Sequence, residues 1–278
     1  MNALTVRIEP ADPRRAAAAA ATLASLPLSF VEAGRSPDGV AGTDVVVLAG
    51  SEGWADRVRA TAHAGGRAVI VTDPLPAGDA GTLVALAPAC AVALAETWAS
   101  SPVVTSVVDR FAGSLGRTRL VDARTLEPRG GRTLREVLFA QLRAVQRLGL
   151  EVASVEIVAE TATSALAVGS STTGARIVLS AARSDTADGS LDLLLVAPDE
   201  TIRIVVPDSA TARPGRAVLS SACEAIEVPT MWQTAHRTAW LRLRDAVADG
   251  SGRGGRLDDV EAFAAATALL PPLSPQPS

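Results

Sequence analysis

The chain has 278 residues, which is long enough for two domains and a large buried core. Its formal charge of −4 and its pI near 5.3 argue against a surface that binds nucleic acid or another polyanion. No apolar stretch is long enough to span a membrane, and the chain opens on a predicted strand instead of a targeting signal. We therefore expect a cytoplasmic protein.

The composition also limits the chemistry. The chain has no lysine and no tyrosine, and its richness in alanine and arginine resembles proteins from high-GC bacterial genomes. Cys90 and Cys223 lie far apart beside small or apolar residues, so we expect two buried thiols in a reducing compartment. Two histidines and two cysteines at scattered spacings form no metal-ligand pattern.

The first forty residues predict a strand at 4–8, a helix that starts near Asp12, and a second strand at 28–32. A dinucleotide-binding fold needs a glycine-rich turn after its first strand, so that the backbone can approach the pyrophosphate. The turn from Glu9 to Pro13 has no glycine, two prolines that lack N–H donors, and two carboxylates that repel phosphate. We therefore expect no bound dinucleotide in the usual way, and we interpret Glu32 as an ordinary exposed carboxylate.

Residues 44–76 predict a strand, a helix and a second strand. The apolar runs at 45–48 and 68–71 are typical of parallel strands buried on both faces. Between them, Ser51 is the predicted N-cap of a helix over 54–64, and a glycine pair stops that helix. A unit of this length predicts a right-handed crossover in a parallel sheet.

Three segments of this unit resemble a known family. DVVVLAG (44–50), AHAGGRAVIV (62–71) and TDPLP (72–76) are similar to the glucose–fructose oxidoreductase, inositol dehydrogenase and MocA family (Gfo/Idh/MocA) of NAD(P)-dependent oxidoreductases. The likeness continues through 101–128, which resembles the family's linking helix and the first strand of its second domain. Residues 132–149 resemble the helix that carries the family's catalytic histidine.

The resemblance implies the family's fold, but not its reactive groups. The family's catalytic lysine falls on Asp73, inside a motif of which only Pro74, a residue that shapes the cleft, is kept. The histidine falls near Phe139 and the acid one turn later near Leu142, and this helix contains no histidine at any register. The family's phosphate-binding glycines fall on the turn that ends at Pro13.

The second half predicts an open, mostly antiparallel sheet. Several of its segments alternate apolar and polar residues, and turn residues separate them. Leu191, Leu193 and Leu195 would share one face, with Leu194 and Val196 on the other. Because the family dimerises through its free sheet face and both predicted faces are largely apolar, we expect a homo-oligomer such as a dimer, or a hetero-oligomer with an active homologue. The predicted strands cover 150–160, 164–169, 176–182, 191–197 and 201–206.

The predicted fold class is therefore α/β, with an N-terminal Rossmann-like parallel sheet and a C-terminal α+β domain. The predicted domains are 1–98 and 99–270, followed by a disordered tail at 271–278. The second domain would end with helices over 231–248 and 257–270, joined by a mobile Gly/Arg/Ser linker.

Two residues are the catalytic candidates: Asp73, and His236, which shares a predicted helix face with Trp232 and Trp240. This stripe is either a ligand-facing wall or core packing. Asp73 is also a candidate partner of Glu96 or Asp109 in a carboxylate pair. His63 has a structural role in the last turn of its helix. The cleft candidates are Pro74, Glu96, Phe139 and Trp232, and no metal site is predicted.

Two functions stay open. The favoured hypothesis is a catalytically degenerate oxidoreductase fold, acting as an accessory subunit of an active homologue or as a small-ligand-binding protein. The alternative is an enzyme that acts on a sugar, cyclitol or other small substrate. It is either an NAD(P)-dependent oxidoreductase or a redox-free enzyme with Asp73 as base.

Overall fold

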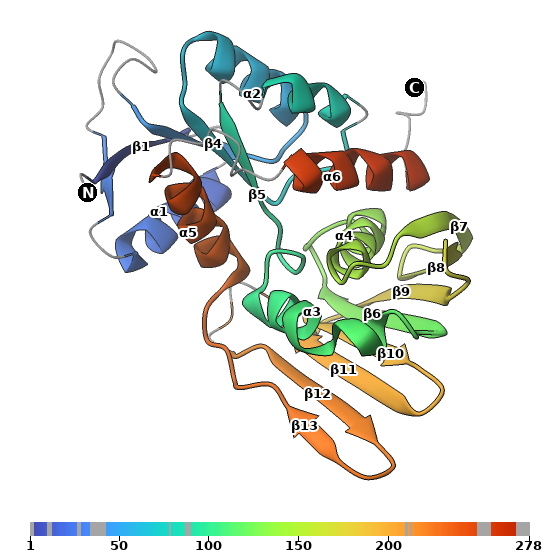
Figure 1. The fold of residues 1–278 in the computed structure, drawn as a ribbon. Helices are drawn as coiled ribbons and strands as arrows, with labels where there is room; N and C mark the ends of the chain where they lie inside the picture. Colours follow the sequence, from blue (N-terminus) through green and yellow to red (C-terminus); the bar gives the residue numbers. More distant parts are fainter. Residues whose placement is uncertain are drawn as a thin grey trace. The chain divides into compact units, whose positions relative to one another are not determined.

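A computed structural model describes residues 3–9, 13–26, 29–33, 43–77, 79–86, 90–208, 211, 213–248 and 257–270. The chain divides into two compact units, which are described separately. The first combines 1–96 with 236–267, and the second combines 97–235 with 268–278. Figure 1 shows the elements of both units in sequence colours.

The first unit is built on a parallel sheet, as predicted. Its described strands follow the order β2-β1-β3-β4-β5, and every neighbouring pair is parallel. The residues of β3 and β4 are buried throughout, which explains their unbroken apolar runs. The strands are β1 (Leu4–Ile8), β2 (Phe30–Glu32), β3 (Val45–Ala49), β4 (Ala68–Thr72) and β5 (Ala91–Ala95).

Helices cover both faces of this sheet (Figure 1). Helices α1 (Pro13–Ser25) and α5 (Ala235–Ala248) share one core cluster with alternate residues of the strands. Helix α2 (Trp54–His63) packs on β3 and β4, and Trp54 meets Phe263 of α6 (Leu257–Leu269) edge to face, with ring centroids 5.5 Å apart. A 3₁₀ helix, η1 (Ala80–Leu86), packs beside α2.

The second unit contains a larger sheet, in which the described strands follow the order β13-β12-β11-β10-β6-β9-β8-β7. All neighbouring pairs are antiparallel except β6 and β9. The predicted open, mostly antiparallel sheet is therefore confirmed. Its strands are β6 (Leu120–Pro128), β7 (Val152–Glu160), β8 (Ser164–Ser171), β9 (Arg176–Ser184), β10 (Leu191–Val196), β11 (Glu200–Val206), β12 (Arg216–Ser221) and β13 (Ala225–Glu227).

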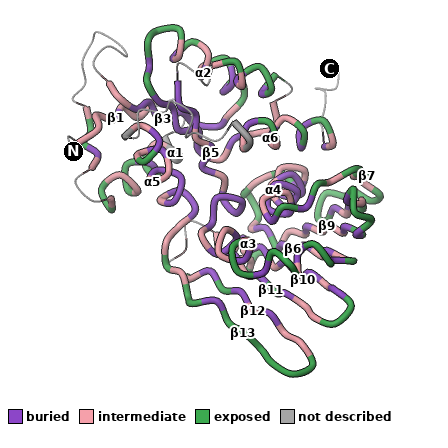
Figure 2. The backbone as a smooth tube through the Cα atoms, in the orientation of Figure 1, coloured by how far each residue is buried: buried purple, intermediate pink, exposed green. Residues whose placement is uncertain are grey.

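Two helices, α3 (Pro102–Leu115) and α4 (Leu134–Arg147), pack on this sheet. Burial alternates along its central strands, as Figure 2 shows in colour. On β10, Leu191, Leu193 and Leu195 are buried, while Leu194 and Val196 are half-buried on the other face, which is the predicted alternation. Helix α4 begins with a reciprocal capping box between Thr133 and Glu136.

The C-terminal helices do not follow the predicted division of the chain. The prediction placed 99–270 in the second domain, whereas His236–Thr267 belong to the first unit. The physical reason is the core of the first sheet, into which Trp240 of α5 inserts against Phe30, with ring centroids 5.2 Å apart. The predicted mobile linker and disordered tail lie outside the described residues.

Three local predictions were wrong. Helix α5 begins at Ala235 and not at Met231, so Trp232 precedes it. The N-cap of α2 is Gly53, with a left-handed φ of 70°, and not Ser51, whose hydroxyl instead accepts from Arg57. Cys223 is exposed in the turn between β12 and β13, whereas Cys90 is buried.

Within the described residues, no helix has the length and apolar character needed to cross a membrane.

Candidate functional site at the carboxyl edge of the first sheet

The turn after β4 holds Asp73 in a strained conformation. Its φ of 46° lies in the left-handed region, and it is the only non-glycine residue with a positive φ in the described part of the chain. Aspartate tolerates this region better than most residues, but the conformation still costs free energy. Strain of this kind persists only where the surroundings enforce it, and it concentrates at functional sites.

Backbone hydrogen bonds on both sides fix this turn. The N–H of Asp73 donates to the carbonyl of Ala95 at the end of β5, over 3.0 Å. On the other side, Gly50 exchanges two 2.8 Å bonds with the strand end: its N–H donates to Thr72, and its carbonyl accepts from Leu75. The indole Nε1 of Trp54 donates to the carbonyl of Leu75 over 2.8 Å.

Gly50 is essential to this packing. A Cβ at Gly50 would lie 2.3 Å from the Cα of Pro74 and 2.5 Å from the carbonyl oxygen of Asp73. Both are backbone atoms that cannot turn aside, so only glycine fits here. Pro74, the one residue of the family's lysine motif that this chain shares, therefore packs tightly against the end of β3. The sequence signal for this role is a glycine directly after the buried strand β3.

The structure brings together the two catalytic candidates. The imidazole Nε2 of His236 lies 3.1 Å from Oδ1 of Asp73, 163 residues away in the chain. The His236 side chain is 9% exposed and the Asp73 side chain 26% exposed. Because the imidazole is nearly covered and the carboxylate is partly open, Asp73 is the member of the pair that solvent reaches more easily.

His236 is held in place by the rest of its helix. It lies in the first turn of α5, and one residue further on Arg237 donates from Nη1 to the carbonyl of Ser25 over 2.5 Å. Trp240, one turn beyond His236, is fully buried in the core of the sheet. The helix therefore presents the imidazole from a fixed support, which favours a preorganised pair.

The other predicted residues are placed differently. Glu96 directly follows β5, the strand next to β4, and is half-buried, so it lies at the same edge of the sheet as Asp73. Asp109 lies on α3 in the second unit, so a carboxylate pair with Asp73 stays a prediction. His63 is exposed in the last turn of α2.

The helix that resembles the family's histidine helix packs in the core at the two matching positions. Phe139 and Leu142 of α4 are both buried, and Leu142 is 0% exposed. Gln141 between them is also buried and donates from Nε2 to the Ser180 carbonyl and the Thr125 hydroxyl. The described environment of Phe139 is therefore packing, and the predicted cleft role of this residue stays a prediction.

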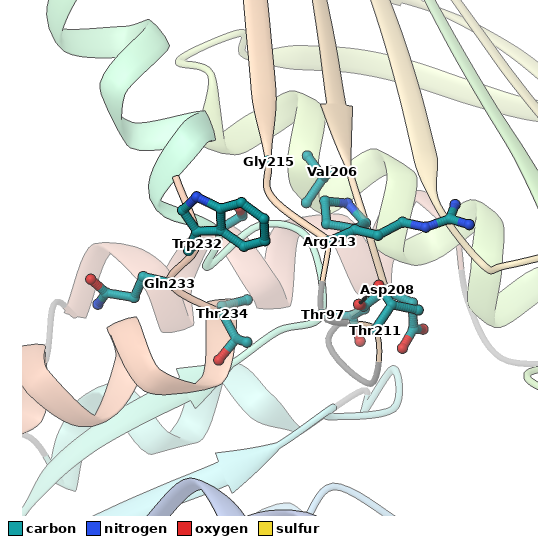
Figure 3. A pocket seen from close by; sticks show the side chains of 12 residues that line it. Thr97, Val206, Asp208, Thr211, Arg213, Gly215, Trp232, Gln233 and Thr234 are labelled. Atoms are coloured by element: carbon teal, nitrogen blue, oxygen red, sulfur yellow. Dashed lines mark hydrogen bonds between the residues drawn. The ribbon is translucent and has the colours of Figure 1, made fainter. Parts of the chain in front are cut away.

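Trp232, predicted to share a helix face with His236 and Trp240, does not do so. It belongs to the segment before α5, its side chain is 70% exposed, and Trp240 is fully buried. Core packing is therefore correct for Trp240, and the aromatic stripe as such was wrong because the helix starts later than expected. Trp232 instead borders a small recess of the second unit (Figure 3).

Ligand-binding elements at the switch point of the first sheet are only partly described. Strand β2 lies on one side of β1, and the chain then crosses to the other side to form β3, so the strand order reverses between β1 and β3, where such folds bind nucleotides. Helix α1 begins there with Pro13, which has no N–H to offer a phosphate. Residues 10–12 of the preceding turn lie outside the described part. The first residue of α1 therefore offers no backbone donor to a phosphate.

A metal site has no support in the described residues either, since they contain no group of three or more His, Cys, Asp or Glu side chains placed to hold an ion. In the first unit, the cysteine Cys90 is also a poor candidate for a reactive group. Burial raises the pKa of the Cys90 thiol to about 11, so the reactive thiolate is scarce at neutral pH.

Comparison with known proteins gives the fold. No protein-family model matches the sequence, and no curated protein matches it. Solved structures match over nearly the whole chain: UDP-N-acetylglucosamine 3-dehydrogenase from Acidithiobacillus ferrooxidans is 15% identical, with 97% of each chain covered and a TM-score of 0.73. The chain has the fold of Gfo/Idh/MocA-type oxidoreductases.

Two further structures agree. A 3-ketoreductase from Actinomadura kijaniata, solved with NADP and TDP-benzene, is 14% identical over 97% of each chain, with a TM-score of 0.71. An oxidoreductase from Pseudomonas syringae is 13% identical, covers 95% of this chain and 94% of its own, and has a TM-score of 0.73. At these identities the likeness shows the architecture and leaves the activity of this chain to its own residues.

Proposed function

We propose that this protein is a catalytically degenerate oxidoreductase of the Gfo/Idh/MocA type that binds a small hydroxylated ligand at the edge bearing Asp73. The observation that carries the proposal is the Asp73–His236 contact at the end of β4. At the position of Asp73 the Gfo/Idh/MocA family has a lysine, whereas this chain has a carboxylate hydrogen-bonded to an imidazole. The rigid, partly open pair is suited to binding hydroxyl groups, which donate to carboxylates.

The chemistry of hydride transfer explains why binding is favoured over oxidation. Oxidising an alcohol needs a base for the hydroxyl proton and a nicotinamide to accept the hydride. The pair could supply the base, but the cofactor needs a phosphate-binding turn, and the turn before α1 has no glycine and ends on Pro13, which lacks an N–H donor. The chain also contains no lysine or tyrosine that could stand in for the family's proton donor.

The relatives in structure suggest the class of ligand. One is a UDP-N-acetylglucosamine dehydrogenase, and another was solved with NADP and TDP-benzene. A sugar or cyclitol is therefore the class of ligand that we expect. A protein that binds such a ligand without turnover would serve as a carrier or as the accessory subunit of an active homologue.

Calorimetric titration of the purified protein with NADH and with NADPH tests the proposal. We expect no saturable heat up to millimolar nucleotide, and no change in absorbance at the nicotinamide band when sugars or cyclitols are added. Micromolar binding together with turnover of a polyol would overturn the proposal. Asp73→Lys is the companion variant: because it restores one reactive group but no phosphate-binding turn, it should not acquire activity.

A second candidate function is proton transfer without redox chemistry. The same contact favours it, because a carboxylate that orients an imidazole is a common acid–base arrangement. Such an enzyme would exchange a carbon-bound proton of its substrate with solvent. Incubation of keto sugars in D₂O, followed by NMR, would reveal deuterium incorporation, and loss of the exchange in Asp73→Asn would assign it to this pair.

The open face of the second sheet is the proposed site of self-association. Its apolar side chains, such as Leu194 and Val196, are half-buried, and the ion pairs Arg124–Asp122 and Arg203–Asp192 lie among them. A face of this mixed character can meet a second copy across a two-fold axis. Sedimentation velocity should give a dimer, and Leu194→Arg should shift it to monomer. A wild-type monomer would exclude this interface.

A further inference from the structure

Trp232 differs from every other tryptophan of the chain. It is 70% exposed, whereas Trp54, Trp98 and Trp240 are each exposed by 1% or less. Leaving an indole in solvent forgoes a large hydrophobic gain, so a single exposed tryptophan beside a recess indicates a contact surface.

The backbone that carries Trp232 is fixed. Met231, the residue before it, forms a two-way bridge with Gly215: the Gly215 N–H donates to Met231 over 2.9 Å, and the Met231 N–H donates back over 3.3 Å. Gly215 in turn packs against Val103 of α3, where an added Cβ would lie 2.9 Å from the valine side chain. The indole therefore projects from a rigid base.

The recess beside Trp232 is lined mainly by polar groups (Figure 3). Gln233 and Thr234 follow Trp232 in the chain, while Asp208 and Thr211 come from the segment after β11. All of these residues belong to the second unit. The recess is small, with a cavity volume of about 20 Å³. A ligand would therefore lie across the indole and project single groups into the recess.

The charged groups at the recess are in ion pairs. Asp208 lies 4.0 Å from Arg132, which is itself bound by the buried Glu127 over 2.9 Å, and its guanidinium stacks on Trp98 at 4.3 Å. At the rim, Arg213 is paired with Asp188. Among the lining residues, Asp208 is a carboxylate and Arg213 a guanidinium, so their formal charges balance. A lining that offers both a carboxylate acceptor and a guanidinium donor suits hydroxyl groups, which both donate and accept.

We propose that Trp232 and this recess form a saccharide-binding subsite that takes a hydroxylated ring. The indole stacks on the apolar face of the ring. Asp208 and Gln233 exchange hydrogen bonds with its hydroxyl groups. The polar lining also distinguishes this subsite from a protein-docking spot, in which an exposed tryptophan usually lies within a larger apolar patch.

Tryptophan fluorescence tests the subsite directly, because acrylamide reaches Trp232 far more readily than its three buried counterparts. The probes are D-glucose, N-acetyl-D-glucosamine and myo-inositol, titrated to high millimolar concentration. We expect at least one of them to shift the emission to the blue, and to lower the quenching constant about two-fold, in a saturable way. This signal reports on Trp232, so it is distinct from the nucleotide titration that tests the Asp73 site.

Variants then assign the contact. Saturation-transfer NMR should show sugar binding to the wild type, a loss of about ten-fold or more in affinity in Trp232→Ala, and a smaller loss in Asp208→Asn. Asp185→Asn removes a carboxylate outside the recess that is 70% exposed and should bind sugar like the wild type. Trp232→Ala is expected to fold normally, since little of its side chain is buried.

Two results would overturn the subsite. The first is an unchanged quenching constant with all three sugars, or equal sugar affinity in the wild type and Trp232→Ala. The second is a self-association that Trp232→Ala abolishes while no sugar shields the indole, which would assign Trp232 to a protein contact.

Discussion

The turn that holds Asp73 and the inner face of α4 are the two places where family resemblance puts catalytic side chains, and they differ in kind. On α4 the positions that the resemblance indicates are packed in the core, with Phe139 and Leu142 buried. At the turn, a carboxylate is held at a φ of 46° against an imidazole 3.1 Å away. One region is apolar packing at these positions, and the other brings two titratable side chains into contact.

This difference separates a region that needs only packing from one that carries strain. An apolar core side chain stabilises the fold without needing a ligand, so α4 requires no further explanation. A left-handed aspartate reduces stability, and packing by Gly50 and Pro74 is needed to maintain it. Strain retained at the carboxyl edge of a parallel sheet is expected where a ligand binds. Stability measurements on variants of each region separate these two cases.

Leu142→Ala carries the largest expected effect. If α4 is now purely structural, removing this fully buried side chain should lower the free energy of unfolding by about 2–5 kcal/mol, through lost burial and the cavity left behind. Leu126→Ala is the matched control, because Leu126 is 56% exposed on β6 and should change stability by less than about 0.5 kcal/mol. Urea denaturation measures both. A small effect at Leu142 would mean that the inner face of α4 is not tightly packed.

Gly50→Ala addresses the support of the Asp73 turn. The added Cβ meets backbone atoms of Asp73 and Pro74, so we expect a loss of about 1–3 kcal/mol and a displaced Asp73. Gly113→Ala is the control: a Cβ there meets nothing within 4 Å, and the residue lies inside helix α3, so this variant should gain about 0.5–1 kcal/mol. If both variants gain stability, the turn is not clamped as described.

The sequence predicted architecture better than chemistry, for a physical reason. Continuous apolar runs such as 45–48 and alternation such as that of 191–196 report burial directly, so both sheets followed from pattern. Helix α5 was different. Its apolar face predicts that the helix is buried, but it does not predict which of the two sheets the helix packs on. The domain assignment of His236 therefore depended on tertiary contacts that no local pattern encodes.

The candidate site shows the same limit. Asp73 and His236 were named separately, from a motif position and from an aromatic spacing that proved wrong. Their contact across 163 residues is visible only once α5 lies on the first sheet. The clamp by Gly50 and the exposure of Trp232 likewise depend on distances between segments that are remote in the chain.

Substitutions of Asp73 itself separate backbone strain from side-chain chemistry. Asp73→Gly relieves the left-handed strain but removes the contact with His236, so its unfolding free energy should stay within about 1 kcal/mol of the wild type. Asp73→Ala keeps the strain and lacks the contact, so it should be about 1–2 kcal/mol less stable than Asp73→Gly. Denaturation of the pair gives the difference. An alanine variant as stable as the glycine variant would show that this backbone relaxes freely.

Asp44 is a carboxylate with a purely structural role, and its substitution has the smallest expected effect on the free energy of unfolding. Partial burial alone would raise its pKa, but hydrogen bonds from Thr5 and Arg67 outweigh burial, and the pKa lies below its usual value of 3.8. Because the folded state favours the charged form, this contribution is complete above the usual value and disappears as the pH falls through the lowered pKa. We expect Asp44→Asn to be less stable than the wild type by no more than about 1 kcal/mol near neutral pH.

The pH dependence decides whether Asp44 acts in this way. Urea midpoints measured from about pH 6 to about pH 2.5 should show the two proteins converging at the acid end, because the wild type loses there what the variant lacks throughout. Asp188 and Asp199, whose pKa values are also lowered, are shared by both proteins, so they cancel in the difference. Parallel curves would contradict the assignment. Convergence would give the pH dependence of stability that a purely structural carboxylate of the first unit causes. The ligand-dependent stability of Asp73→Asn can then be compared with it.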